Sequence, residues 1–144
     1  MEDEIYTELV ILSHKLTPGQ LNMTLGIKCD ESHMIGDLRK HTIIHEKENA
    51  WAIKSRLPRN APLKEHITHL LERVSPITEK IKNIAEQPDV EVEFVCIIFT
   101  SNRPAMFFTK EQVATICAMG ASIDIDLYLL PRRQKKVTNK TDPV

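Results

Sequence analysis

Residues 89–100 have the sequence DVEVEFVCIIFT, the most hydrophobic stretch of the chain. Every second residue from Val90 to Ile98 is apolar, as expected for one face of a β-strand. On the opposite face, Glu91 and Glu93 are followed by apolar residues, so the second half of the strand is apolar on both faces. This pattern predicts a strand at the centre of a sheet.

Working outward, four more segments rich in β-branched and aromatic residues predict strands. These segments are residues 5–13, 41–45, 50–55 and 122–130. The polar turn over residues 46–49 predicts that the second and third of them form a hairpin. The mixed polar segment 28–38 predicts a loop.

Two short helices are predicted from capping boxes, in which a threonine is followed three residues later by a glutamine. Thr17 with Gln20 marks the first helix, and Thr109 with Gln112 marks the second. Each box precedes an apolar segment that ends at a glycine. The similarity indicates either a structural half-repeat or two ordinary helices with similar caps.

From Leu63 to Ile84, apolar residues recur at steps of three and four. This spacing predicts an amphipathic helix of about 20 residues, which Pro76 kinks or divides. The predicted order is β-α-β-β-α-β-α-β. It favours an α+β fold, a two-layer α/β sandwich with a mixed, mostly antiparallel sheet and helices on one face.

The length of 144 residues fits one domain, which we expect over residues 1–131. Residues 132–144 hold five basic residues and one aspartate, a charge of +4, and are expected to be a flexible tail. The other 131 residues hold 14 basic and 19 acidic residues, a charge of −5. A mildly acidic body argues against a nucleic-acid-binding domain.

The N-terminus is acidic and lacks the basic and apolar regions of a signal peptide. The apolar runs are far shorter than the roughly 20 residues that span a bilayer. The three cysteines are odd in number and widely spaced, which favours free thiols in a reducing compartment. We therefore expect a cytoplasmic protein with no membrane association.

Several motifs together resemble the bacterial domain-of-unknown-function family 4279 (DUF4279). In order, they are LTP (16–18), LGI (25–27), WAIKS (51–55), LKEHI (63–67) with LL (70–71), and MGASIDIDLY (119–128). The resemblance covers most of the chain, from about Ile5 to Leu130. It implies a small two-layer α/β domain and implies no activity.

The densest group of metal-ligand residue types is Cys29, His33, His41 and His45. If His41 and His45 share a strand face, they lie about 13 Å apart at roughly 3.3 Å per residue. One zinc ion cannot bridge that distance, because its nitrogen ligands lie near 2 Å. We therefore expect no metal and no other cofactor.

No residue pattern predicts catalysis. Cys96 lies in the most hydrophobic strand and Cys117 follows Ile116 near a helix end, so both thiols are expected in the core. His66 and His69 flank apolar positions and are expected at the core boundary. The chain has four glycines, no nucleophile-elbow motif and no phosphate-binding loop. We expect that it is not an enzyme.

Trp51 and Ser55 are expected to point to the same side of one strand. Trp51, the only tryptophan, is interpreted first as a core anchor. The alternative is that Trp51 lines a pocket or an interface, with Ser55 and Arg56 beside it.

Four carboxylates lie on two predicted strands: Glu91, Glu93, Asp124 and Asp126. If these strands pair, the four residues form an acidic patch on the open face of the sheet. Such a patch is either a solvated surface or a docking surface for a basic partner.

These observations favour a small non-catalytic binding protein. The first hypothesis is a protein-binding inhibitor of the immunity type, directed against a bacterial toxin with a basic surface, a nuclease being one candidate. The alternative is a domain that binds a small molecule or metal through the Trp51 region or the histidines. Either is compatible with a monomer or with a homodimer formed through an exposed strand edge.

Overall fold

The hydrophobic stretch 89–100 forms the long strand β4 (Val90–Thr100) inside a five-stranded sheet, as predicted. The computed structural model describes residues 2–132. The other strands are β1 (Glu4–Ser13), β2 (Glu31–His33), β3 (Asn49–Lys54) and β5 (Ala121–Leu129). The strand order is β2-β3-β1-β4-β5, in which only the β4–β5 pair is parallel. The sheet is therefore mixed and mostly antiparallel.

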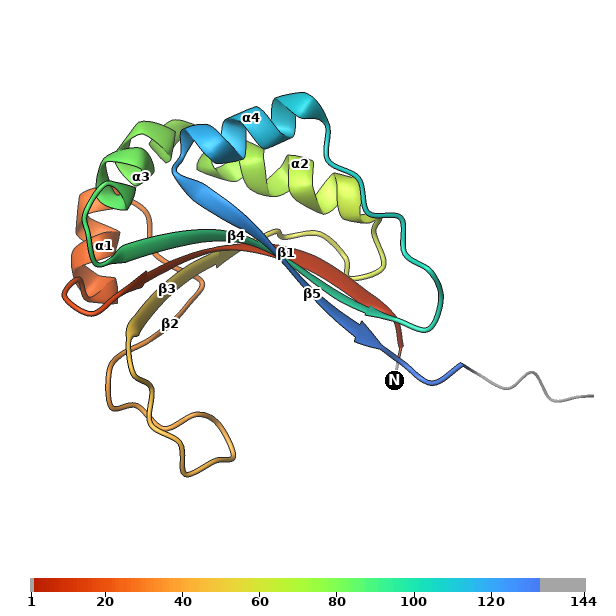
Figure 1. The fold of residues 1–144 in the computed structure, drawn as a ribbon, viewed down its shortest axis with the longest axis horizontal. Coiled ribbons are helices and arrows are strands. Elements are labelled where there is room, and N and C mark those ends of the chain that lie inside the picture. Colours follow the sequence, from red (N-terminus) through yellow and green to blue (C-terminus); the bar gives the residue numbers. More distant parts are fainter. Residues whose placement is uncertain (1, 133–144) are drawn as a thin grey trace, which may run out of the picture.

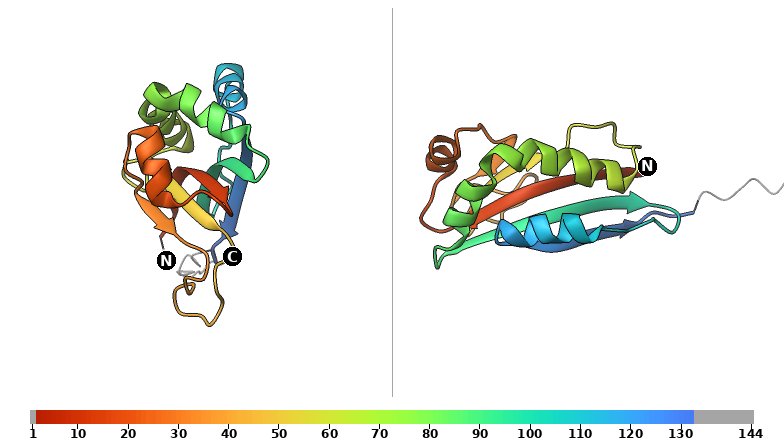
Figure 2. Two further views of the ribbon diagram at one scale, coloured as in Figure 1. Left: turned by 90° about the vertical axis from the view of Figure 1, so that its left-hand side faces the viewer. Right: turned by 90° about the horizontal axis from the view of Figure 1, so that it is seen from above.

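All the helices cover one face of this sheet, which confirms the two-layer α+β architecture (Figures 1 and 2). They are α1 (Pro18–Leu25), α2 (Leu63–Val74), α3 (Thr78–Ala85) and α4 (Lys110–Ala118). The predicted long helix is divided by a short 3-10 turn, η1 (Ser75–Ile77), which contains Pro76. In the described part of the chain, no helix is long and apolar enough to cross a membrane.

Both predicted capping boxes are present. The side chains of Thr17 and Thr109 accept hydrogen bonds from the amides of Gln20 and Gln112, and each glutamine side chain bonds back to its threonine. The strands that follow differ, because β2, which follows α1, pairs with β3 and not with β1, whereas β5, which follows α4, pairs directly with β4. The two helices therefore share a cap but not a topology.

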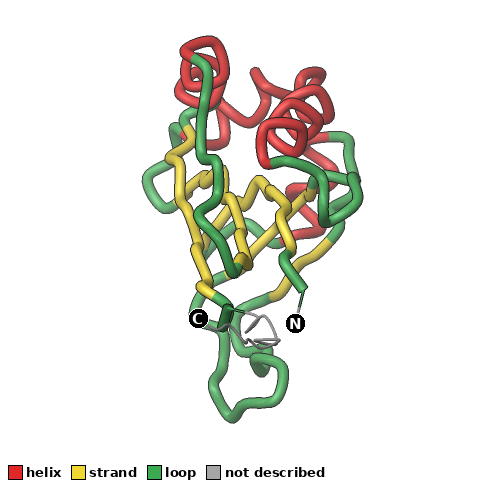
Figure 3. The backbone as a smooth tube through the Cα atoms, turned by 90° about the vertical axis from the view of Figure 1, so that its right-hand side faces the viewer, coloured by secondary structure: helices red, strands yellow, loops and turns green. Residues whose placement is uncertain are grey.

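The predicted hairpin of residues 41–45 with 50–55 is wrong. The strand that pairs with β3 is β2, in a segment predicted to be a loop. Residues 34–48 instead form a loop that extends below the sheet (Figures 1 and 3). Its turn places His41 at a φ of 63°, and the side chain of Ile43 is 91% exposed. Residues 41–45 are rich in apolar residues, but no strand of the sheet lies beside them, so they do not form a strand of it.

The core lies between the sheet and the helices. Alternate residues of β4 from Val90 to Ile98 face it, as predicted. The largest fully buried side chains are Trp51, Phe94, Leu9, Ile11, Leu21, Leu25, Ile53, Ile67, Leu70, Ile81, Ile98 and Ile116. Phe108, at the start of the α4 region, meets Phe94 edge to face at 6.2 Å.

One glycine is required at the turn between α4 and β5. Gly120 has a φ of 74°, and a Cβ placed there would lie 2.8 Å from the Cβ of Ala85. The turn therefore approaches the end of α3 more closely than a side chain allows.

Candidate functional site

The face of the sheet opposite the helices, called here the open face, carries a group of carboxylates. Strands β4 and β5 pair so that Glu93 lies beside Ser122 and Val95 lies beside Asp124. Glu93, Asp124 and Asp126 are thereby brought together, and Glu91 lies two residues before Glu93 along β4. The pairing that the acidic-patch hypothesis requires is therefore present.

The carboxylates of this acidic patch oppose one another electrostatically. Burial raises the pKa of Glu93, and the neighbouring charges of Asp124 and Glu91 raise it further. Burial and the charge of Asp124 likewise raise the pKa of Asp126. Within residues 2–132, none of the four predicted carboxylates forms an ion pair. The patch therefore presents negative charge that the described part of the chain does not neutralise.

Glu8 of β1 belongs to the same face and was missing from the predicted site. It lies between Lys54 of β3 and Val95 of β4. Burial raises its pKa, and Asp126 is among the charges that add to the rise. Glu8 alternates with the core-facing Thr7 and Leu9, which indicates that its side chain points to the open face. The sequence alone does not show which residues lie beside it, because they belong to strands that are distant in the chain.

The other end of the open face is basic and aromatic. The guanidinium of Arg59 lies 3.7 Å from the ring centre of Tyr6, and the ammonium of Lys54 lies 5.4 Å from it. Phe99 stacks on Tyr128 with ring centres 4.6 Å apart. The four carboxylates of the acidic patch thus lie on β4 and β5 before Phe99 and Tyr128, with Glu8 of β1 on the same face. There the surface is hollowed by about 320 Å³ between Glu91, Glu93, Gly120 and Ser122.

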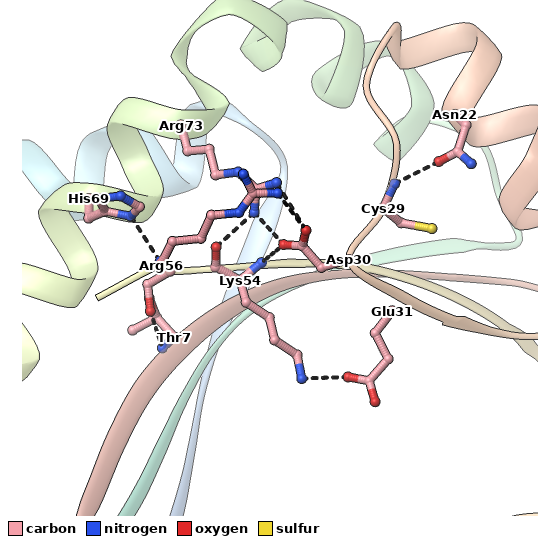
Figure 4. Close-up of polar contacts among 10 residues, drawn as sticks. Thr7, Asn22, Cys29, Asp30, Glu31, Lys54, Arg56, His69 and Arg73 are labelled. Carbon is pink, nitrogen blue, oxygen red and sulfur yellow. Dashed lines mark hydrogen bonds and ion pairs between the residues drawn. The ribbon is translucent and has the colours of Figure 1, made fainter. Parts of the chain in front are cut away.

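Trp51 is fully buried, in agreement with its interpretation as a core anchor. Its indole N–H donates to Oδ1 of Asn22 over 2.8 Å. The same oxygen accepts the amide of Cys29 (Figure 4). Trp51 therefore joins β3 to the end of α1 and is not accessible to a ligand in this structure.

Ser55 is also buried, and it forms a pair with His66 that resembles a catalytic dyad in its residue types. Its hydroxyl accepts the amide of Thr7 at 3.1 Å and lies 2.7 Å from Nδ1 of His66. Because the carbonyl of Pro58 can only accept, Nε2 of His66 carries the ring proton and donates to it at 3.1 Å, and Nδ1 of the neutral ring accepts the hydroxyl proton of Ser55. Every polar atom of the pair is occupied, and His66 is fully buried. The pair joins β1, β3 and α2 rather than activating a nucleophile.

A second polar cluster surrounds Asp30, just before β2 (Figure 4). Its carboxylate accepts hydrogen bonds from the guanidinium groups of Arg73 and Arg56 and from the amide of Lys54. Burial opposes the charge, but these bonds outweigh it and hold the pKa of Asp30 well below its usual range. Arg73 also donates to the carbonyl of Lys54 at 2.8 Å. The cluster fastens α2 to the sheet, and it holds one more positive charge than negative because two guanidinium groups share one carboxylate.

The remaining candidates are dispersed. In the described part of the chain, no three His, Cys, Asp or Glu side chains lie close enough to hold a metal ion. Cys96 is buried, and burial raises the pKa of its thiol to about 12. The expectation that Cys117 is buried is wrong, because α4 directs Ile116 and Met119 to the core and leaves Cys117 exposed.

A groove of about 790 Å³ lies between α2 and the segment that leads into α4. Its apolar lining includes Leu57, Pro58, Ala61 and Phe107, and Phe107 is 70% exposed. His69 lies on its rim. Sequence reasoning did not find this groove, because its lining comes from three separate segments.

The chain folds as a small α+β domain with an acidic patch on the open face of its sheet. The family model for the domain of unknown function DUF4279 matches residues 3–130. The chain belongs to this family, as its motifs suggested. No curated protein and no solved structure matches the chain.

Proposed function

We propose that this chain is a non-catalytic, protein-binding inhibitor of the immunity type, which acts in the bacterial cytoplasm without a cofactor. Its partner is a toxin domain with a basic surface, a nuclease being one candidate. The acidic patch of Glu91, Glu93, Asp124 and Asp126 is the docking surface.

The observation that carries the proposal is the grouping of four carboxylates on β4 and β5, none of which forms an ion pair within residues 2–132. Burial and the charges of the neighbouring carboxylates raise the pKa of Glu93 and of Asp126. Carboxylates held together with raised pKa values reduce the stability of the free protein at neutral pH. A partner that brings lysines or arginines to this face relieves the repulsion between the carboxylates. The free energy of that repulsion is present only in the unbound protein, so its relief favours the complex. Phosphate groups would be repelled by the same face, which supports a protein partner over a nucleic acid or an anionic membrane.

The absence of an enzymatic role is supported by the state of the reactive groups. Ser55 and His66 form a closed network, and Cys96 is buried with a raised pKa. The thiol of Cys96 packs in the core, and the nearby charge of Asp124 adds to the effect of burial in raising its pKa.

The test uses the products of the two genes that flank the gene of this chain. Each product is expressed in a bacterial host, alone and together with the full chain, and colony counts are compared. We expect one product to stop growth and the chain to restore it. Two harmless products, or a toxic product that the chain does not neutralise, would contradict the proposal.

The acidic patch is tested in the same assay by the variant Glu93→Lys/Asp124→Lys. The matched control, Glu79→Lys/Glu86→Lys, makes the same change of charge at exposed positions in and next to α3. Loss of rescue with the first variant only is the expected result. Equal rescue by both would remove the patch from the binding surface.

The alternative function, binding of a small molecule, is favoured by one observation, the apolar groove beside α2. Its volume of about 790 Å³ falls in the range of drug-sized pockets. The groove does not include Trp51, which is buried elsewhere. Amide chemical shifts recorded against a library of small apolar compounds test this function: saturable shifts confined to residues around Phe107 and His69 would support it.

A further inference from the structure

The two edges of the sheet differ in how they are protected. The edge strand β2 has three residues, whereas β5 has nine. In the described part of the chain, β5 pairs with β4 on one side and with no strand on the other. Its backbone therefore presents a long row of free N–H and C=O groups.

Edge strands of natural proteins are usually blunted by lysine, proline, a bulge or a covering segment. The sequence of β5, ASIDIDLYL, contains no lysine or proline. Its pairing with β4 continues residue by residue from Ala121 to Leu129 without a bulge. Two aspartates are its only charged residues.

The side chains of β5 alternate between two chemical surfaces. Ile123, Ile125 and Leu127 point to the side of the helices, and each is about 40% exposed. Asp124 and Asp126 point to the open face, beside Glu93. A strand added to this edge therefore meets apolar groups on one side and carboxylates on the other.

This charge pattern distinguishes between possible occupants. In an antiparallel pairing of two copies centred on Ile125, Asp124 of one copy lies opposite Asp126 of the other. Like charges directly opposite each other destabilise a pair of strands. A segment that alternates basic and apolar residues instead places its cations beside both aspartates.

We propose that β5 accepts an extended segment of the protein partner as a sixth strand, and that this segment alternates lysine or arginine with apolar residues. The basic side chains meet Asp124 and Asp126, and the apolar side chains cover Ile123, Ile125 and Leu127. The proposal rests on the protein-binding function and specifies how the partner binds.

The probe is a synthetic peptide as long as β5 that alternates lysine with valine, added to the full chain. Binding is measured by fluorescence anisotropy, and hydrogen exchange is followed at the amides of β5. We expect saturable binding and slower exchange in β5. The same peptide with alternate backbone nitrogens methylated, on the edge that would face β5, is expected to lose binding because it cannot donate to the strand.

Two variants separate strand addition from general attraction of charge. Asp124→Lys/Asp126→Lys is expected to weaken peptide binding about tenfold or more, since two cross-strand attractions become repulsions. Glu79→Lys/Glu86→Lys is expected to bind as the wild type does. Circular dichroism and the melting temperature establish that each variant is folded.

Three results would overturn the proposal. They are no peptide binding, equal binding of the methylated peptide, and protection in the free protein of the β5 amides that point away from β4. The last result would mean that a second copy or the chain itself occupies the edge. If a flanking-gene product is neutralised while β5 stays unprotected in that complex, the protein-binding function stands and the role of β5 does not.

Discussion

The hydroxyl of Ser55 lies 2.7 Å from Nδ1 of His66, and both side chains are buried where β3, β1 and α2 meet. Burial lowers the pKa of His66, so the ring is neutral in the folded protein. In the unfolded chain it regains its ordinary value of about 6.5. The unfolded state therefore binds more protons as the pH falls below that value, and the folded state loses stability.

Substitution of His66 in the Ser55–His66 pair is predicted to lower the stability of the protein by an amount that depends on pH. His66→Gln should destabilise the protein at pH 7.5 by about 1–3 kcal/mol, because the hydroxyl of Ser55 loses its acceptor. The deficit should shrink at pH 5.5, where the wild type must deprotonate His66 in order to fold. Urea unfolding at both pH values measures the difference.

The control for that prediction is Ile67→Val, on the same helix, which removes no titratable group and should show a deficit that is independent of pH. A deficit in His66→Gln that stays constant between the two pH values would contradict the assignment of a neutral, buried ring.

The acidic patch predicts that removal of its charge stabilises the fold. Glu93→Gln/Asp126→Asn should raise the free energy of unfolding at pH 7.5 by about 0.5–1 kcal/mol, a modest gain because both groups are partly exposed and screened. Since the folded pKa values are raised, the wild type recovers this stability as the pH falls and the carboxyls protonate. The gain should therefore decrease in acid and in high salt.

Chemical denaturation over a pH series measures this gain. The comparison variant Glu79→Gln/Glu86→Gln, at exposed positions in and next to α3, should change stability little. If the patch variant were less stable than the wild type at pH 7.5, the carboxylates would be structural rather than repulsive.

The three thiols are predicted to react at different rates with a disulfide reagent at pH 8. Cys117 is exposed and should react first, and the half-buried Cys29 should follow more slowly. Cys96, with a pKa of about 12, should react only when the protein unfolds. Mass spectrometry of the labelled peptides identifies each thiol, and early labelling of Cys96 would show that β4 is not buried as described.

The turn before β5 predicts unequal effects of two glycine substitutions. Gly120→Ala should cost about 2 kcal/mol or more, since it combines a φ of 74° with a Cβ contact of 2.8 Å. Gly36→Ala, with a φ of 91° and no atom within 4 Å, should cost only about 1 kcal/mol from the backbone. Thermal melts of both variants test the order, and an equal loss would mean that the contact with Ala85 relaxes without cost.

The sequence predicted those helices and strands whose conformation is determined by residues within the same segment. The central position of β4 follows from its two apolar faces, and both short helices follow from their capping boxes. The strand β2 was missed because its residues, Glu-Ser-His, are polar and gain their conformation from pairing with β3. Residues 41–45 were assigned to a strand on composition, but no neighbouring strand pairs with them there.

The same distinction applies to the candidate site. The acidic patch could be anticipated because the carboxylates alternate along two strands, but its location depended on the pairing of β4 with β5. Glu8 and the Ser55–His66 pair were missed because their neighbours are distant in the chain. Trp51 is buried, as its interpretation as a core anchor requires, and Ser55, which was considered only as part of a pocket or interface, is buried as well. Apart from Arg132, the expected basic tail over residues 132–144 lies outside the described residues.

The central claim is that the acidic patch on the open face binds a basic protein surface. The measurement that tests it most directly is the dissociation constant of the complex with the neutralised flanking-gene product, for the wild type, Glu93→Lys/Asp124→Lys and Glu79→Lys/Glu86→Lys. We expect at least about tenfold weaker binding for the first variant and wild-type binding for the second. Wild-type affinity in a folded Glu93→Lys/Asp124→Lys protein would contradict it.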